Sequence, residues 1–260
     1  MAEPFLRIYG SCDWCPMPGN DASTYLLDDR IIIDTGWKGV SNLIDDQMDP
    51  LQAPLMLFTH LHPDHRLALP QLLMYWRIRT GSLAGLSIAG PAERIQTLYE
   101  HAFDYLFHDE PDWRTEVAAH ANILPVNPGD VIETKEHIIV SAASQHNVPG
   151  RMYRITHKAT GRTIGFTGDT GYFDGIGEFF AGVDTLVCEC THGAIPKDLI
   201  QKSADSHMNV WDVAKIANVA QPQQLILTHC TKDRDAALDA ILPLVSCDVF
   251  WAEPNDMLLY

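Results

Sequence analysis

The sequence lacks long hydrophobic runs: nowhere do about 18 apolar residues follow one another, as a membrane-spanning helix would require. Its first ten residues do not have a basic run followed by an apolar stretch, which is the pattern of an export signal. Long Ser/Gly-rich linkers, low-complexity tracts and internal repeats are also missing. These absences predict a cytoplasmic protein that folds as a single domain over residues 1–260, a length compatible with one layered α/β unit.

Basic residues are scarce, with 18 Lys and Arg against 34 Asp and Glu and a formal net charge of −16. A protein that grips a phosphate backbone normally carries a basic face. The charge balance therefore argues against a long nucleic acid as the substrate. It still permits a small phosphorylated molecule that is held mainly by metal ions.

Cysteine is also sparse, with six residues in the chain. Cys12 and Cys15 have the spacing of half a structural zinc site, but no second pair follows at a suitable distance. Cys188 and Cys190 are two residues apart on a predicted strand, where they face the same side and cannot easily bridge. Reduced thiols are the favoured interpretation.

What the chain does contain is a series of short strands and a few helices. Runs of β-branched and aromatic residues predict strands at 4–9, 23–28, 30–34, 55–58, 86–89, 121–124, 137–142, 152–156, 163–167, 183–188, 224–228 and 247–251. Helical patterns occur at 66–79, 91–107, 210–220 and about 233–243. We expect Pro91 in the first turn of its helix, Asn209 as an N-cap, and residues 108–120 to be irregular. This order predicts an α+β fold in which two sheets pack face to face with helices outside.

The strongest chemical signal is the segment His60-Leu61-His62-Pro63-Asp64-His65, which follows a buried-strand pattern. Alternation places His60 and His62 on the same side of an extended segment, where they can share one ion. Asp64 and His65 come after Pro63 has bent the chain, and they can face a second ion. Imidazole and carboxylate donors without thiolate suit Zn, Fe or Mn. The alternative, a solvated His-rich turn, does not explain the further candidate ligands downstream.

The arrangement His-x-His-x-Asp-His after a strand resembles the signature of the metallo-β-lactamase superfamily. Ile33-Asp34-Thr35-Gly36, His146 after a strand, Asp169 in Phe166-Thr167-Gly168-Asp169-Thr170, and His229 in Leu227-Thr228-His229 match other elements of that family in the correct order. The likeness covers roughly residues 5–232. It implies a four-layer αβ/βα sandwich, made of two mixed sheets with helices outside, that holds metal at one edge of the sheets.

The resemblance also implies how the ligands are shared. His60, His62 and His146 would bind one divalent ion, and Asp64, His65 and His229 would bind the other, with Asp169 bridging the two. Zn or Mn are the foremost expectations and Fe is a further one. In such enzymes a hydroxide between the ions attacks the substrate, and Asp64 helps to orient it. Relatives are often homodimers, so this chain is expected to form one as well.

Two further residues point to one branch of the superfamily. Glu189, in the segment 186–192, and His207, in Ser206-His207-Met208-Asn209, resemble the Glu–His dyad of tRNA 3′-end endonucleases and related phosphodiesterases. In that branch the histidine protonates the leaving oxygen, a contribution of about 10²–10⁴-fold in rate. His207 could otherwise be a surface histidine near a helix cap.

The chain departs from the tRNA-processing enzymes in three respects. Only 22 residues separate His146 and Asp169, which leaves room for a hairpin but not for the long arm that grips tRNA. Position 68 is Ala where that branch usually has Gly, and position 209 is Asn instead of Thr. Together with the acidic charge, these differences favour a phosphodiesterase that acts on a small or cyclic phosphate.

Three alternatives remain open from the sequence. The same site could hydrolyse an acyl ester, a lactone or a β-lactam, and such an enzyme would not need a proton donor at His207. An iron-dependent oxidoreductase is a second possibility, which the metal content of purified protein would reveal. The third is a metal-bound scaffold without turnover. The six other histidines are expected to be structural or solvated: His101, His108, His120, His137, His157 and His192.

Overall fold

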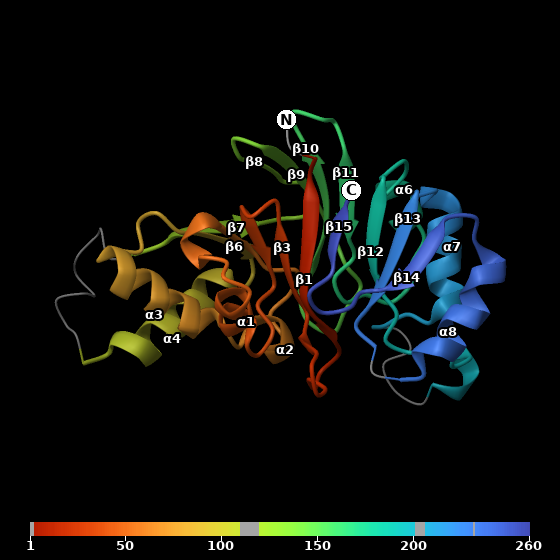
Figure 1. Ribbon diagram of the computed structural model, residues 1–260, viewed down its shortest axis with the longest axis horizontal. Helices are drawn as coiled ribbons and strands as arrows, with labels where there is room; N and C mark the ends of the chain where they lie inside the picture. Colours follow the sequence, from red (N-terminus) through yellow and green to blue (C-terminus); the bar gives the residue numbers. More distant parts are fainter. Residues whose placement is uncertain (1–2, 110–119, 201–205, 231) are drawn as a thin grey trace.

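Two β-sheets face each other at the centre of the molecule, and helices cover both outer sides (Figure 1). The computed structural model describes residues 3–109, 120–200, 206–230 and 232–260. The layers follow the order helix, sheet, sheet, helix. The α+β expectation and the four-layer αβ/βα sandwich are therefore confirmed.

The first sheet is formed mainly by the N-terminal half of the chain. Its spatial order is β15 (Met257–Leu259), β1 (Phe5–Cys12), β3 (Thr24–Leu27), β4 (Ile31–Ile33), β5 (Leu55–Leu57), β6 (Ser87–Pro91) and β7 (Asn122–Val126), with β2 (Asp21–Ala22) paired to β1. The pairs from β15 to β4 are antiparallel, and those from β4 to β7 are parallel. This sheet is therefore mixed, as expected.

The second sheet belongs to the C-terminal half. Its order is β14 (Asp248–Trp251), β13 (Gln224–Thr228), β12 (Thr185–Glu189), β11 (Thr163–Phe166), β10 (Arg151–His157), β9 (His137–Ala143) and β8 (Val131–Glu133). Its pairs change from antiparallel between β8 and β11 to parallel between β11 and β14. The two sheets thus repeat one pattern, in which antiparallel strands are followed by parallel ones.

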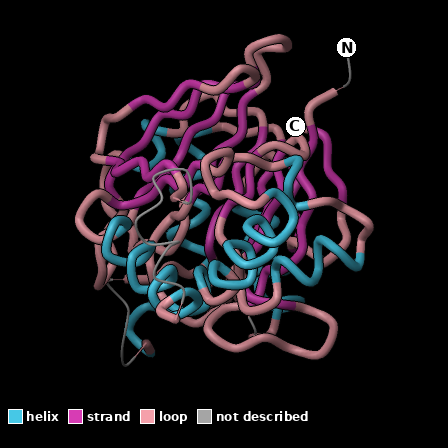
Figure 2. The backbone as a smooth tube through the Cα atoms, turned by 90° about the vertical axis from the view of Figure 1, so that its left-hand side faces the viewer, coloured by secondary structure: helices cyan, strands magenta, loops and turns pink. Residues whose placement is uncertain are grey.

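Helices lie outside both sheets (Figure 1), and Figure 2 shows the molecule from the side of the first helical layer, with cyan helices overlapping the magenta strands. Beside the first sheet lie α1 (Gly39–Asp45), η1 (Pro50–Gln52), α2 (Pro63–Arg66), α3 (Leu69–Thr80) and α4 (Ile95–Phe107). Beside the second lie α6 (Ile176–Phe179), η3 (Lys197–Leu199), α7 (Val210–Ala220), α8 (Arg234–Ile241) and η4 (Leu242–Leu244). Asn209 caps α7 as expected, because its side chain accepts hydrogen bonds from the backbone of Trp211 and Asp212. None of the helices within the described residues has the length and apolar character needed to cross a bilayer.

The core lies in three layers that match this architecture. One cluster fills the space between the sheets, with Leu6 and Ile8 of β1 packed in the same cluster as Ile155 and Ile164 of the second sheet. A second cluster lies under α3 and α4, and a third under α7 and α8. Apolar side chains from both sheets pack closely in the middle layer. This packing fixes the position of one sheet relative to the other.

Two predicted helices differ from the observed ones. The predicted helix 66–79 is divided into α2 and α3, with Pro70 in the first turn of α3, where its missing N–H is tolerated. Pro91 was expected in the first turn of a helix over 91–107, and this is wrong. It is the last residue of β6, paired with Val126, and α4 begins only at Ile95. Residues 108–120 were expected to be irregular. Of these, residues 110–119 lie outside the part of the chain that the structure describes.

Asp28 joins three distant parts of the chain at the end of the sandwich where β3 turns into β4. Its carboxylate accepts hydrogen bonds from the Phe5 backbone and the Tyr260 hydroxyl, both at 2.6 Å, and its Oδ2 lies 2.6 Å from Nε2 of His137. Burial would raise the pKa of Asp28, but the hydrogen bonds from His137 and Tyr260 outweigh it and lower this pKa below its usual range.

We expect Asp28→Asn to lower the free energy of unfolding at pH 7 by about 1–3 kcal/mol, since it weakens charge-assisted hydrogen bonds. A lowered folded-state pKa contributes stability above the ordinary aspartate pKa of about 3.9, and this contribution is lost as the pH falls through the folded value. The difference in free energy of unfolding between the wild type and Asp28→Asn should therefore become smaller in acid. Urea unfolding at neutral and acidic pH would measure this difference. The control is Asp29→Asn, which affects a half-exposed pair with Arg7 and should cost less. Equal losses for the two variants, or a gap that widens in acid, would contradict this account.

Candidate metal centre

The candidate ligands lie at the carboxyl ends of strands from both sheets. His60 follows β5, Asp169 follows β11, and His229 comes directly after β13. Parallel strands in each sheet end at the same edge, where loops can carry functional side chains. The two sheets face each other, so these loops converge, and an antiparallel bridge between His60 and Gly150 ties the two edges together.

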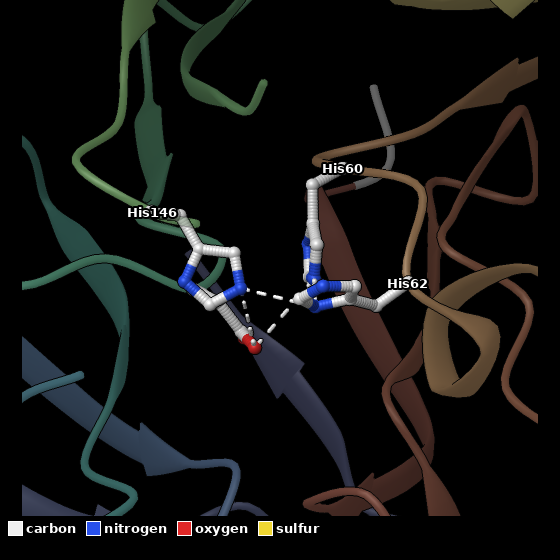
Figure 3. A group of neighbouring side chains, drawn as sticks. His60, His62 and His146 are labelled. Carbon is white, nitrogen blue, oxygen red and sulfur yellow. Dashed lines mark hydrogen bonds and ion pairs between the residues drawn. The ribbon is translucent and has the colours of Figure 1, made fainter. Parts of the chain in front are cut away.

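The first group consists of His60, His62, His146 and Asp169, whose donor atoms lie within 4.8 Å of one another. Nδ1 of His62 is 3.1 Å from Nε2 of His60 and 3.0 Å from Nε2 of His146. Figure 3 shows ring nitrogens of these three histidines directed toward a common point, with His146 approaching from the opposite side. Oδ2 of Asp169 is 3.6 Å from Nε2 of His60.

The second group consists of Asp64, His65, Asp169 and His229. Nε2 of His229 is 3.2 Å from Oδ2 of Asp64 and 3.3 Å from Oδ2 of Asp169. Nε2 of His65 is 3.4 Å from one oxygen of each carboxylate. Asp169 is shared by both groups, and it is only 3% exposed. The structure thus brings the seven candidate ligands together in two groups that share Asp169, and Glu189, His207 and His229 form a third candidate group beside them.

The protonation of the histidines differs between the two groups. Burial, reinforced by neighbouring imidazoles, lowers the pKa of His62 to about 4 and that of His60 well below its usual value. In the second group burial also opposes protonation, but Asp169 and the other carboxylates raise the pKa of His65 and His229. A metal ligand must be a neutral imidazole. The carboxylates that raise these pKa values supply negative charge that a bound cation would also satisfy.

Several observations fit two divalent cations in these positions. Among the described residues, Oδ1 of Asp64 is buried and has no hydrogen-bond partner. His62 Nδ1 faces two other ring nitrogens, and these three atoms cannot all be matched as donors and acceptors of hydrogen bonds. A set of imidazole and carboxylate donors suits Zn, Mn or Fe. The fold implies divalent ions, and the donor set agrees with it without identifying the metal.

A second layer of contacts orients the ligands. Asp34, directly after β4, accepts hydrogen bonds from the backbone and hydroxyl of Thr59 and lies 2.7 Å from Nδ1 of His65. This contact leaves Nε2 of His65 directed into the second group. A carboxylate on the outer nitrogen of a ligand histidine fixes its ring and tautomer. Asp34 therefore lies beneath the site and orients His65.

Glu189 and His207 form a dyad beside the second group. Nδ1 of His207 lies 3.0 Å from Oε1 of Glu189, and the His207 ring stacks on that of His229 at 5.6 Å. Burial would lower the pKa of His207, but Glu189 outweighs it and raises this pKa to about 9. Glu189 is 1% exposed, whereas the His207 side chain is 15% exposed. The dyad thus pairs a fully buried carboxylate with a partly exposed imidazole whose pKa that carboxylate raises.

Sequence reasoning missed two residues that connect these groups. The Thr191 hydroxyl donates to Oε2 of Glu189 at 2.7 Å and lies 2.9 Å from Nδ1 of His229. The backbone oxygen of Ser206 lies 2.9 Å from Nδ1 of His146, which fixes the orientation of that ring. Threonine and a backbone carbonyl carry no pattern of their own in the sequence. Only the tertiary contacts reveal them.

One histidine that was expected to be structural lies close to the site. His192 is 4% exposed, its ring is 6.0 Å from that of His207, and Nζ of Lys232 is 3.3 Å from its Nδ1. By contrast, the cysteines take no part in the candidate metal groups of the described residues. Cys12 is buried and Cys15 is exposed, and both are free thiols.

A sequence profile for the β-lactamase superfamily domain matches residues 29–230, most of the chain. The uncharacterised protein Rv1339 of Mycobacterium tuberculosis is 29% identical over 218 residues, which cover 82% of this chain and 75% of that protein. A ribonuclease Z of Pyrobaculum islandicum is 25% identical over 246 residues, with 84% of each chain covered.

Solved structures show the same fold. The metallo-β-lactamase fold protein YhfI of Bacillus subtilis superposes with a TM-score of 0.82 at 20% identity and covers 99% of each chain. Yeast PDE1 superposes with a TM-score of 0.75 at 14% identity and covers all of both chains. At these identities the likeness concerns the fold, and the chemistry has to be argued from the side chains.

Proposed function

Because the chain belongs to the metallo-β-lactamase superfamily and is a hydrolase of that fold, we propose that it hydrolyses a phosphodiester in a small molecule. The substrate class, the metal loading and the roles of the residues are all part of this proposal. The names of the relatives agree with it, since one is a ribonuclease Z and one structural neighbour is called PDE1.

The observation that carries the proposal is the Glu189–His207 dyad next to the candidate metal ligands. Nδ1 of His207 is 3.9 Å from Oδ2 of Asp169, so the imidazole borders the same space as the ligand set. Hydrolysis of a phosphodiester must expel an alkoxide, and a protonated imidazole at this position lowers the cost of that step. An acyl substrate such as a lactone gives no comparable reason for a protonated histidine here.

Each residue of the site has a definite task in this reaction. His60, His62 and His146 would hold one ion, Asp64, His65 and His229 would hold the other, and Asp169 would be shared by both. When bound, the two ions supply Lewis acidity and lower the pKa of water. Glu189 accepts a hydrogen bond from Nδ1 of His207, which fixes the ring and stabilises its protonated form, and His207 gives the proton on its other nitrogen, Nε2, to the leaving oxygen. The Thr191 hydroxyl aligns Glu189 with the ring of His229.

Two features of the protein favour a small substrate. The chain between His146 and Asp169 forms the β10–β11 hairpin, in which Lys158 to Arg162 connect the strands, and it contains no protruding arm. The net charge of −16 opposes a polyanion that would need a long basic track. A compact phosphodiester requires only the local charge that two bound ions provide.

We expect the protein, loaded with Mn or Zn, to hydrolyse bis-p-nitrophenyl phosphate, because the aryl leaving group makes this ester a permissive substrate for any phosphodiesterase. The measurement is release of p-nitrophenolate, with EDTA-treated protein as the control. A panel of phosphodiesters should be tested beside a panel of lactones. Turnover of lactones with no phosphodiester cleaved would refute the phosphodiesterase assignment and leave the metal site in place.

A further inference from the structure

A tryptophan borders the candidate metal centre and has no role in the chemistry described so far. The ring of Trp14 lies 5.5 Å from that of His62, with an interplanar angle of 74°. Its side chain is nevertheless 54% exposed. A single exposed aromatic residue is common on protein surfaces. One that touches a candidate metal ligand and keeps most of its area open is placed to meet whatever enters the site.

The loop that carries Trp14 is closed at its base. Trp14 lies just after β1, and the chain returns through a pair of backbone hydrogen bonds between Met17 and Asn20, at 2.9 and 3.0 Å. The Asn20 side chain accepts from the Ser11 backbone at 3.0 Å and donates to the Ser11 hydroxyl at 3.0 Å. These contacts hold the loop beside His62, so the position of Trp14 is built into the fold.

The chemistry of the indole ring indicates what it can hold. A flat aromatic side chain next to a phosphate site binds a nucleobase by stacking, and every base offers a face for this contact. A quaternary ammonium group is typically enclosed by several aromatic rings. Among the described residues, the ring contact of Trp14 is with His62. An indole that is more than half exposed and has no aromatic cage among the described residues therefore favours a planar ring over a cation.

We infer that Trp14 is the stacking platform for the base of a nucleoside phosphodiester, and that it determines specificity for this substrate class. The inference rests on the proposed phosphodiesterase function and names its substrate. A nucleoside places its base one sugar away from the phosphorus, which suits a platform in contact with a ligand of the candidate metal centre. The acidic charge limits the substrate to a single nucleoside unit, because stacking of one base needs no basic track.

Three p-nitrophenyl phosphodiesters with the same leaving group test this inference: the thymidine 5′-ester, the choline ester and the ethyl ester. We expect Trp14→Ala to raise KM for the thymidine ester about tenfold, the loss of one base–aromatic contact, and to leave the other two esters within about twofold. Trp14→Phe keeps a ring and should restore most of the binding. Trp37→Ala is the matched control, because Trp37 is 41% exposed and has no role in the site.

Other results would overturn the inference. An equal loss of kcat on all three esters would mean that Trp14 only positions His62, and a selective loss on the choline ester would indicate a cation site. Calorimetric binding of thymidine 5′-monophosphate and ribose 5-phosphate to the metal-loaded protein gives a readout that does not depend on turnover. Weaker binding of the nucleotide alone in Trp14→Ala supports the platform even if no ester is cleaved, in which case only the phosphodiesterase proposal fails. Unchanged nucleotide binding overturns the platform.

Discussion

Asp169→Ala should lose metal from both halves of the site and lower the rate of hydrolysis at least about 10²-fold, since a shared ligand supports both ions. The structure gives the reason. The carboxylate is buried, and Nε2 atoms of His60, His65 and His229 lie 3.3 to 3.6 Å from its oxygens. These imidazoles keep the pKa of Asp169 well below its usual value although burial opposes this. Among the described residues, Asp169 is the one member common to the two candidate groups, so its loss leaves them without a shared ligand.

The measurement is elemental analysis of protein purified without added metal and again after equilibration with Zn or Mn. The melting temperature should be recorded with metal and with EDTA, because an ion that binds only the folded chain raises stability. We expect this metal-dependent rise to be large in the wild type and largely lost in Asp169→Ala. The matched control is Asp174→Ala, an exposed carboxylate five residues further along the chain. Full metal content in Asp169→Ala would refute the bridging role.

The architecture could be predicted largely because the strands are short apolar runs separated by clear turns. Strand 224–228 and helix 210–220 have the predicted bounds, since the first is a buried strand and the second begins at the Asn209 cap. The elements that were missed are all short. They include α1, α6, β2, β8 and β15, which have two to seven residues each, and runs of this length show little or no periodicity in the sequence.

Pro91 shows where local reasoning fails. Proline in the first turn of a helix and proline at the end of a strand look alike in the sequence, because in both places its missing N–H costs little. The pairing of β6 with β7 decides between them, and Pro91 lies opposite Val126. Such pairing depends on the whole sheet, and the sequence around Pro91 alone does not reveal it.

More features of the candidate site than of the fold could be predicted, because the chemistry of the site depends on a few residue types. Three histidines and an aspartate within six positions already indicate a metal, and the order of the later elements adds His146, Asp169 and His229. The supporting contacts could not be predicted in the same way. Thr191 and the backbone of Ser206 act through distances to residues far away in the sequence. Trp14 was missed because only the fold brings its loop beside His62.

His207→Ala is expected to slow hydrolysis of a phosphodiester with an alkyl leaving group at least about 10²-fold, the ordinary contribution of a general acid. An alkoxide needs a proton as the bond to phosphorus breaks, and His207 holds one because Glu189 raises its pKa to about 9. The p-nitrophenolate leaving group is far more stable as an anion. We therefore expect a much smaller loss with bis-p-nitrophenyl phosphate, and the ratio of the two losses is the diagnostic quantity.

The control variants separate proton donation from support of the metal site. His157→Ala removes a histidine that contacts Thr160 in the β10–β11 turn, and it should leave both rates unchanged. Glu189→Gln keeps the shape of the dyad but removes the charge that holds the proton, so the loss should again be larger for the alkyl ester. Metal content must stay equal to that of the wild type in each variant.

Equal losses on both esters would mean that His207 acts by positioning His229, on which its ring is stacked at 5.6 Å, instead of by donating a proton. Unchanged rates on both would remove the reason for preferring a phosphodiester over an acyl substrate, because the dyad is the feature that an acyl hydrolase does not need. A leaving-group-dependent loss is the result that only a proton donor gives. It would connect the buried Glu189, the protonated His207 and the adjacent metal ligands in a single reaction.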